Sequence, residues 1–127
     1  MIKRICREKK KERVIVLHYV YILLLNDNRF YIGETNNIIR RYFQHLIGNG
    51  AYITKSVGVK EMLCYWRCEN RKIGRKFEKY LKKLTRVNKI DLIRNPELLG
   101  VKYGVKLNSD DYEFVLVNEY FDEEEKK

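Results

Sequence analysis

Apolar residues recur along the chain with two different spacings, one typical of strands and the other typical of helices. The two spacings distinguish the expected strands from the expected helices. Residues 18–25 and 29–33 are rich in Tyr, Ile, Leu and Val and are joined by an Asn-Asp-Asn segment, which predicts a β-hairpin with a tight turn. Residues 61–68 contain another apolar run and predict a third strand in the middle of the sheet. The pattern therefore predicts a small antiparallel sheet.

The segment after the hairpin has the spacing of an amphipathic helix. Residues 38–47 follow three residues that can cap a helix, Thr35, Asn36 and Asn37, and they precede Gly48, which favours a helix end. The apolar stripe of this helix comprises Ile39, Tyr42, Phe43 and Leu46, and the polar side chains off the stripe are Arg40, Arg41, Gln44 and His45.

The remaining pattern completes the expected fold. Apolar positions recur at helical spacing within residues 71–86, and a shorter helix over residues 87–94 ends before Pro96. Residues 112–120 form one more β-like run. We expect an α+β fold in which helices flank a small antiparallel three-stranded sheet, and the last run offers this sheet a further strand from a C-terminal extension.

Length and charge narrow the class of protein. The 127 residues have the usual length of one compact domain. Lys and Arg outnumber Asp and Glu by 27 to 17, and the net charge of +10 favours a polyanionic partner, nucleic acid before an acidic membrane surface. A surplus that only aids solubility is the plain alternative. We divide the chain into a basic arm (1–17), a domain (18–95) and an extension with an acidic tail (96–127).

Cysteines and the amino-terminal segment bear on the compartment. The three cysteines form no Cys-x-x-Cys motif, so we expect free thiols in a reducing compartment, with Cys64 and Cys68 in the core. The apolar run 14–25 follows a basic start as in a secretory signal, but it contains His18 and two tyrosines and lacks a small-residue cleavage site. Its 12 residues are too few to cross a bilayer. The sequence predicts a soluble, cytoplasmic protein without a membrane partner.

Five sequence features occur in a distinctive order. Tyr19-Val20-Tyr21 is followed by Tyr31-Ile32-Gly33, then by Arg41, by His45 one helical turn later, and by Glu78 in the next long helix. This order resembles the GIY-YIG nuclease family over residues 18–95, especially its small stand-alone bacterial and archaeal members and the amino-terminal nuclease domain of the excision-repair incision protein. The chain departs from the family name at its first triplet, where Gly-Ile-Tyr would stand, but it keeps the tyrosine.

The same residues suggest phosphodiester chemistry on physical grounds. Side chains alternate along a strand, so a hairpin places Tyr21, Tyr31 and Gly33 on one side of the sheet. Arg41 and His45 are four residues apart on a helix, and their Cβ atoms are therefore about 5–6 Å apart on one face. A guanidinium can stabilise the extra charge of the transition state, while a phenol or an imidazole handles the proton of an attacking water.

A carboxylate that could hold a metal ion completes the set. Mg²⁺ commonly takes one or two protein carboxylates and fills its shell with water and substrate phosphate, and Glu78 suits this mode. The resemblance implies that Tyr21 and Tyr31 position or deprotonate the water, that Arg41 holds the phosphate and that His45 assists proton transfer. It further implies that Glu78 carries Mg²⁺ or Mn²⁺ and that DNA is cut to 5′-phosphate and 3′-hydroxyl ends. The identity of the general base stays open.

Cationic residues are expected to hold the DNA backbone, at Arg40, Lys55, Arg75, Lys79, Lys82 and Lys83. Tyr52, Thr54 and Lys55 follow a glycine-rich loop and are further candidates for substrate contact. Trp66 is expected in the core. The expected substrate is structured or single-stranded DNA, because the chain has little room for a separate specificity domain.

Other interpretations remain for each group. The two tyrosines could form a cross-strand aromatic pair that only stabilises the hairpin. Arg41 and His45 could be ordinary solvent-exposed residues of a helix, and Glu78 could form a surface ion pair. At the level of the whole protein, the alternatives are a nucleic-acid-binding module without catalysis and an interaction protein that forms a homodimer through the C-terminal strand at residues 112–120.

Overall fold

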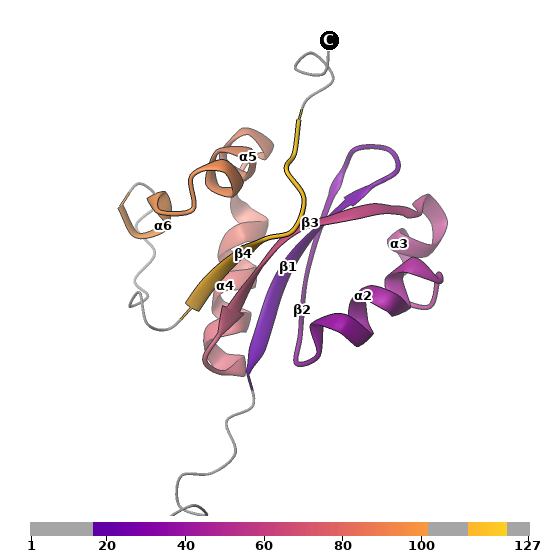
Figure 1. Ribbon diagram of the computed structural model, residues 1–127, viewed down its shortest axis with the longest axis horizontal. Helices are drawn as coiled ribbons and strands as arrows, with labels where there is room; N and C mark the ends of the chain where they lie inside the picture. The colour runs from indigo at the N-terminus through magenta and orange to yellow at the C-terminus, as the bar shows by residue number, and fades with distance from the viewer. Residues whose placement is uncertain (1–16, 102–111, 122–127) are drawn as a thin grey trace, which may run out of the picture.

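An antiparallel sheet with helices on both faces forms the body of the molecule (Figure 1). The computed structural model describes residues 17–101 and 112–121. In chain order the elements are β1 (His18–Leu25), β2 (Phe30–Thr35), α2 (Ile38–Leu46), α3 (Tyr52–Val57), β3 (Val59–Cys68), α4 (Arg71–Lys83), α5 (Arg86–Arg94), α6 (Leu98–Val101) and β4 (Tyr112–Leu116).

The predicted hairpin is confirmed as β1 and β2. Its turn is closed by backbone hydrogen bonds from Leu25 N to Arg29 O and from Asn28 N to Leu25 O, and Asn28 has a positive φ of 70°. Asparagine tolerates this left-handed backbone better than most residues. In the register that this turn sets, Tyr21 pairs with Gly33. The turn therefore places the Tyr19-Val20-Tyr21 triplet opposite the strand that carries Tyr31-Ile32-Gly33.

The sheet contains four strands in the order β2-β1-β3-β4, which corrects the expected three. The fourth strand comes from the C-terminal extension, where β4 pairs with β3 from Cys68↔Tyr112 to Cys64↔Leu116. The long strand β3 lies between β1 and β4, and its second edge would expose unpaired backbone groups without β4. The pairing thus satisfies an edge that three strands would leave open.

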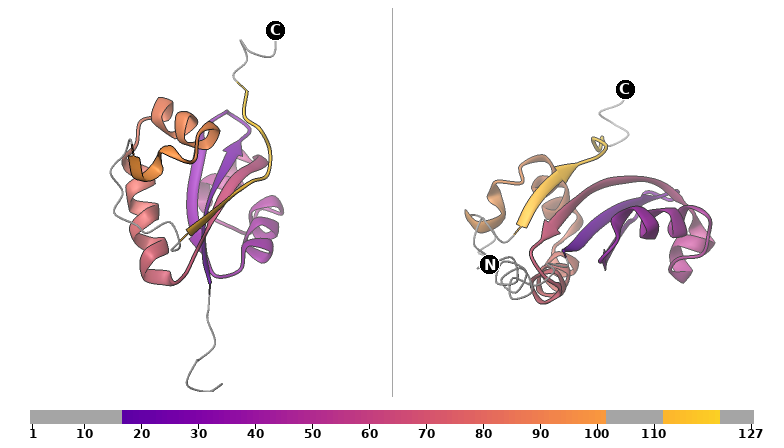
Figure 2. Two further views of the ribbon diagram at one scale, coloured as in Figure 1. Left: turned by 60° about the vertical axis from the view of Figure 1, so that its left-hand side comes forward. Right: turned by 60° about the horizontal axis from the view of Figure 1, so that its bottom comes forward.

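Helices α4, α5 and α6 lie on one face of this sheet and α2 lies on the other (Figure 2). An apolar layer fills the space between the sheet and the helices on each face. The larger layer packs β1, β2 and β3 against α4, α5 and α6, and it is centred on Trp66, Phe77 and Leu81. Cys64 and Cys68 are buried in the same layer, so the expected core roles of the two cysteines and of Trp66 are confirmed. The smaller layer lies under α2 and contains the inward tyrosines of the hairpin.

The orientation of α2 differs from the one that its apolar stripe indicates. Ile39 is 81% exposed and Phe43 is 59% exposed, while His45 is only 1% exposed. The side that meets the sheet carries Tyr42, whose hydroxyl accepts a hydrogen bond from Met62 N at 3.1 Å, and the buried His45. Specific polar contacts with the sheet therefore set the rotation of this helix, and the other three residues of the apolar stripe, Ile39, Phe43 and Leu46, face solvent.

The described chain contains two short helices that its pattern does not predict, α3 and α6. The N-cap residue of helix α3 is Ala51, which offers no side-chain cap, and the helix contains β-branched residues, so its local helix signal is weak. Contacts with α2 hold it in place. Within residues 17–101 and 112–121, every helix lacks the length and apolar character needed to cross a membrane.

Candidate active site

Tyr21 lies at the centre of the candidate site because its ring passes directly over β2. A Cβ atom at Gly33 would lie 2.4 Å from the Tyr21 hydroxyl oxygen, so only glycine leaves room for the phenol there. Tyr31 points to the same side of the hairpin, and the two ring centroids are 6.4 Å apart. The expectation that the hairpin brings the two phenols together is confirmed, with Tyr21 buried and Tyr31 half-buried.

His45 contacts both tyrosines from α2. Its Nε2 atom lies 2.7 Å from the Tyr21 hydroxyl oxygen, and its ring centroid is 5.2 Å from that of Tyr31. On the other side of the ring, Nδ1 lies 2.9 Å from the Thr54 hydroxyl oxygen. The loop after α2 passes close against the imidazole. A Cβ atom at Gly50 in this loop would lie only 2.3 Å from Nδ1. The imidazole is thus enclosed and held at both nitrogens.

Burial keeps both hydrogen-bonded partners uncharged near neutral pH. Burial, together with the Arg41 guanidinium, lowers the pKa of His45 to about 4. Burial also raises the pKa of Tyr21 to about 12, although Arg41 opposes this shift. A neutral phenol beside a neutral imidazole forms a pair in which the phenol oxygen can take a proton from another group as it passes its own proton to the imidazole.

Lowering the pH from 6.5 to 5 is expected to reduce the free energy of unfolding by about 1.5 kcal/mol through His45. The pKa of His45 falls from 6.5 to about 4 on folding, so between these values the unfolded chain binds a proton that the folded chain does not. Stability is therefore lost as the pH falls through this window. Urea unfolding of the wild type and of His45→Gln at several pH values measures the effect.

The variant His45→Gln should lose this part of the pH dependence, since glutamine does not titrate. Burial lowers the pKa of His18 as well, so His18→Gln serves as the matched control for the other histidine. Parallel pH profiles for the wild type and His45→Gln would contradict the assignment.

Arg41 lies beside the phenol and imidazole pair. Its Nη1 atom donates a hydrogen bond to Gln44 Oε1 at 3.1 Å on the same helix. The guanidinium influences the pKa of both Tyr21 and His45, which places its charge next to both groups. Arg41 is half-buried, so a held cation meets solvent at the edge of the buried pair.

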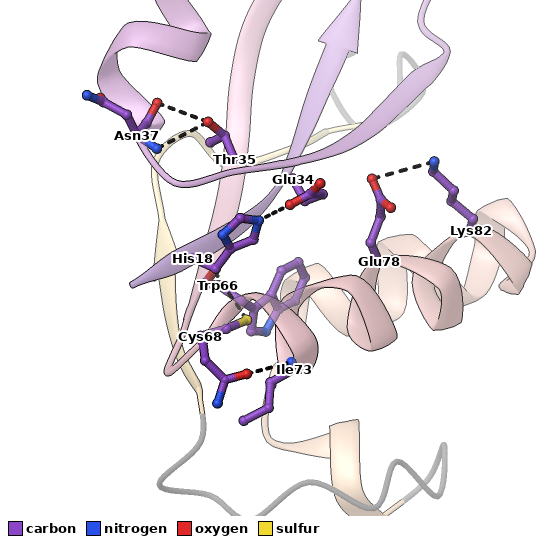
Figure 3. A network of polar contacts seen from close by, with 10 residues as sticks. His18, Glu34, Thr35, Asn37, Trp66, Cys68, Ile73, Glu78 and Lys82 are labelled. Atoms are coloured by element: carbon purple, nitrogen blue, oxygen red, sulfur yellow. Dashed lines mark hydrogen bonds and ion pairs between the residues drawn. The ribbon is translucent and has the colours of Figure 1, made fainter. Parts of the chain in front are cut away.

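Glu78 approaches the site from α4, on the opposite face of the sheet. Its charge acts on the pKa of Tyr21 and on that of His18, which places the carboxylate near β1. Figure 3 shows Glu78 on α4 beside Lys82, whose Nζ lies 3.5 Å from Glu78 Oε2. Because β2 is an edge strand, groups from both faces can reach a substrate at its outer side.

The donor set fits one kind of metal ion. Residues 17–101 and 112–121 contain no group of three or more His, Cys, Asp or Glu side chains that could hold a metal. A site made of one carboxylate, with water and substrate phosphate as the other ligands, is a common way to bind Mg²⁺. Glu78 fits that mode because its side chain is 18% exposed and pairs with Lys82, whose side chain is itself 54% exposed.

A second polar pair near the site was not predicted by the motifs. The buried His18 ring contacts the Glu34 carboxylate across the hairpin (Figure 3). The pKa of His18 is lowered by burial, and the charges of Glu34 and Glu78 act against this shift. Glu34 follows Gly33 directly in β2. This position beside the Tyr31-Ile32-Gly33 triplet was the sequence feature from which a role near the site could have been predicted.

The cations that we expect to contact DNA lie on three helices, α2, α3 and α4. Lys55 is exposed on α3, near the 84% exposed ring of Tyr52 in the same helix. Thr54, by contrast, lies behind the His45 ring and is 1% exposed, so the expected contact of Thr54 with substrate is wrong. The other exposed cations are Arg40 on α2 and Arg75, Lys79, Lys82 and Lys83 on α4.

Comparison with known proteins identifies the family of the chain. The model of the GIY-YIG catalytic domain matches residues 17–91, which contain all five of the candidate catalytic positions. The chain belongs to the GIY-YIG family. The family defines a nuclease class, and the expected resemblance is confirmed.

Within this class, the chain is similar to small proteins named UPF0213. One from Clostridium perfringens is 35% identical over 92 residues, which cover 72% of this chain and 99% of that protein. One from Bacillus licheniformis is 39% identical over 88 residues, covering 68% and 89%. The solution NMR structure of a UPF0213 protein from Bacillus halodurans is 32% identical, with a TM-score of 0.43, and covers 68% of this chain and 89% of that chain. These names state no activity.

Proposed function

We propose that the protein is a metal-dependent endonuclease that hydrolyses DNA phosphodiester bonds and leaves 5′-phosphate and 3′-hydroxyl ends. The observation that carries the proposal is the hydrogen bond between Tyr21 and His45, two neutral buried groups beside the Arg41 guanidinium. A purely structural pair would not need an arginine held at its edge and a carboxylate acting on the same phenol from another helix. Membership of a nuclease family supports the same conclusion.

The proposed reaction is direct attack of water on the phosphorus atom. The Tyr21 hydroxyl shares its proton with His45 Nε2 and keeps a lone pair that can take a proton from the water. As the water oxygen bonds to phosphorus, the water proton moves to the phenol oxygen and the phenol proton moves to Nε2, which makes His45 an imidazolium. The bond between phosphorus and the 3′ oxygen breaks, the 3′ oxygen takes a proton from solvent, and His45 returns its extra proton to solvent. Tyr21 therefore carries no net charge at any stage, which suits its buried position.

Arg41 and Tyr31 complete the protein's part in this reaction. The guanidinium can donate two parallel hydrogen bonds to oxygens of the scissile phosphate and stabilise the charge that grows there. Tyr31 is half-buried next to His45, and its hydroxyl is assigned to positioning the attacking water. A divalent ion held by Glu78 would stabilise negative charge on the leaving oxygen.

The surface of α4 supports DNA as the substrate. Its cations lie on the exposed side of a helix whose other side is buried against the sheet, and Glu78 lies between them and the sheet. Cations in such a row contact backbone phosphates, which carry no sequence information. This arrangement favours recognition of DNA shape, as in branched or single-stranded DNA, over recognition of a long base sequence.

One cleavage panel tests the proposal. Labelled single-stranded, duplex and branched DNA are incubated with the protein in Mg²⁺, in Mn²⁺ and in chelator, and the ends of any product are identified. We expect cleavage only with a divalent ion and only to 5′-phosphate and 3′-hydroxyl ends. Binding of all three substrates without cleavage under any condition would identify a non-catalytic nucleic-acid-binding module instead.

A further inference from the structure

A buried chain of hydrogen bonds continues beyond the Tyr21 and His45 pair into α3. His45 Nδ1 lies 2.9 Å from Thr54 Oγ1, and this hydroxyl donates to the Ala51 carbonyl oxygen at 2.8 Å. Tyr21, His45 and Thr54 are each 1% exposed, so bulk water has little access to the contacts of the His45 ring. The chain therefore runs from the phenol, through the imidazole and the hydroxyl, to a backbone carbonyl.

Counting protons along this chain determines which ring nitrogen carries hydrogen. A threonine hydroxyl has one proton, and the Thr54 proton is used in the bond to the Ala51 carbonyl. The contact between Thr54 and His45 must then have Nδ1–H as the donor and the hydroxyl oxygen as the acceptor. A neutral imidazole has only one N–H group, so Nε2 keeps its lone pair and accepts the Tyr21 hydroxyl proton.

We propose that Thr54 is a positioning residue, which holds His45 in the Nδ1–H tautomer so that Nε2 accepts the proton of Tyr21. This inference rests on the proposed function for its catalytic meaning, although the tautomer itself does not depend on it. With the opposite tautomer, Nε2–H would donate to the phenol oxygen, and Nε2 would have no lone pair with which to accept the Tyr21 proton. The hydroxyl of Thr54 thus sets the direction of proton transfer without touching the substrate.

The fold supplies the geometry that this role needs. The Ala51 carbonyl that receives the Thr54 proton belongs to the N-cap residue of α3, and it also accepts a hydrogen bond from Lys55 N at 3.1 Å. Gly50 lets the preceding loop close against the imidazole, where a Cβ atom would clash with the ring. The short helix α3 therefore brings one hydroxyl to Nδ1 and fixes its proton in the opposite direction.

The experiment uses Thr54→Val, which keeps the shape and removes the hydroxyl, and Thr54→Ser, which keeps the hydroxyl. Ser56→Ala is the matched control, because Ser56 is an exposed hydroxyl on the same helix. Long-range ¹H–¹⁵N NMR of the full chain at pH 7 reports which nitrogen of His45 is protonated. We expect Nδ1–H in the wild type, Thr54→Ser and Ser56→Ala, and a substantial Nε2–H population in Thr54→Val.

Cleavage kinetics provide the second measurement. Thr54→Val should lower kcat by roughly 10- to 100-fold, the usual effect of losing a group that orients a functional histidine, with little change in KM. Thr54→Ser should restore kcat. An Nε2–H signal in the wild type, or an unchanged tautomer in Thr54→Val, would overturn the proposal. A wild type that shows Nδ1–H but cuts no DNA would refute the nuclease and leave the tautomer assignment standing.

Discussion

Replacing Glu78 with glutamine is expected to reduce DNA cleavage by roughly a thousandfold, because metal ions contribute several kcal/mol of transition-state stabilisation. The amide keeps the size of the side chain and removes the charge that would hold a divalent ion. Affinity for DNA, measured in chelator, should stay unchanged or rise, since one negative charge leaves a basic surface. Single-turnover cleavage over a range of Mn²⁺ and Mg²⁺ concentrations measures the loss.

Glu97→Gln is the matched control, since Glu97 is an exposed carboxylate outside the site. It should cut DNA at the wild-type rate. The ion pair of Glu78 with Lys82 is an exposed i,i+4 contact, whose loss changes stability by only about 0.5 kcal/mol, so the thermal midpoint of Glu78→Gln should remain close to that of the wild type. Wild-type cleavage by Glu78→Gln would remove the carboxylate from the mechanism.

Replacing Arg41 with alanine is expected to lower the cleavage rate by roughly 10²- to 10³-fold, the usual effect of removing one preorganised donor from a developing charge. Lysine at this position should recover only part of the rate, because it keeps the charge and lacks the planar pair of donors. The reason lies in the placement of the guanidinium beside the Tyr21 and His45 pair. Cleavage rates at saturating DNA and metal measure both variants.

Arg40→Ala provides the control for Arg41, since Arg40 is the neighbouring residue on the same helix and is exposed. If Arg40 only contacts backbone phosphates, its loss weakens DNA binding and reduces the dependence of binding on salt, while the rate at saturating DNA is unchanged. Equal losses in the saturated rate for the two variants would show that Arg41 acts only through general charge.

The hairpin was predictable because its information is local. Alternation along two strands and a polar turn fix which side chains share a face, so the meeting of Tyr21 and Tyr31 over Gly33 followed from the sequence. Local signals also located β3, α4 and α5 to within a few residues. The fourth strand was indicated only as a β-like run, since its pairing with β3 depends on contacts distant in sequence.

The rotation of α2 was not predictable from its apolar stripe. Hydrophobic periodicity assumes that apolar side chains face the core, but here Ile39 and Phe43 face solvent while His45 is buried. A buried histidine is stable only where partners meet both ring nitrogens, and those partners come from β1 and α3. The role of Thr54 and the pair formed by His18 and Glu34 were missed for the same reason.

The close passage of Tyr21 over β2 also limits how this sequence can vary. At position 33, even a methyl group would occupy the space of the phenol oxygen. A library with all twenty amino acids at position 33, selected for DNA cleavage, should return glycine alone. A library at the exposed turn between β1 and β2 should return many different residues. If Gly33→Ala cut DNA at the wild-type rate, the Tyr21 ring would have to adopt another position without loss of activity.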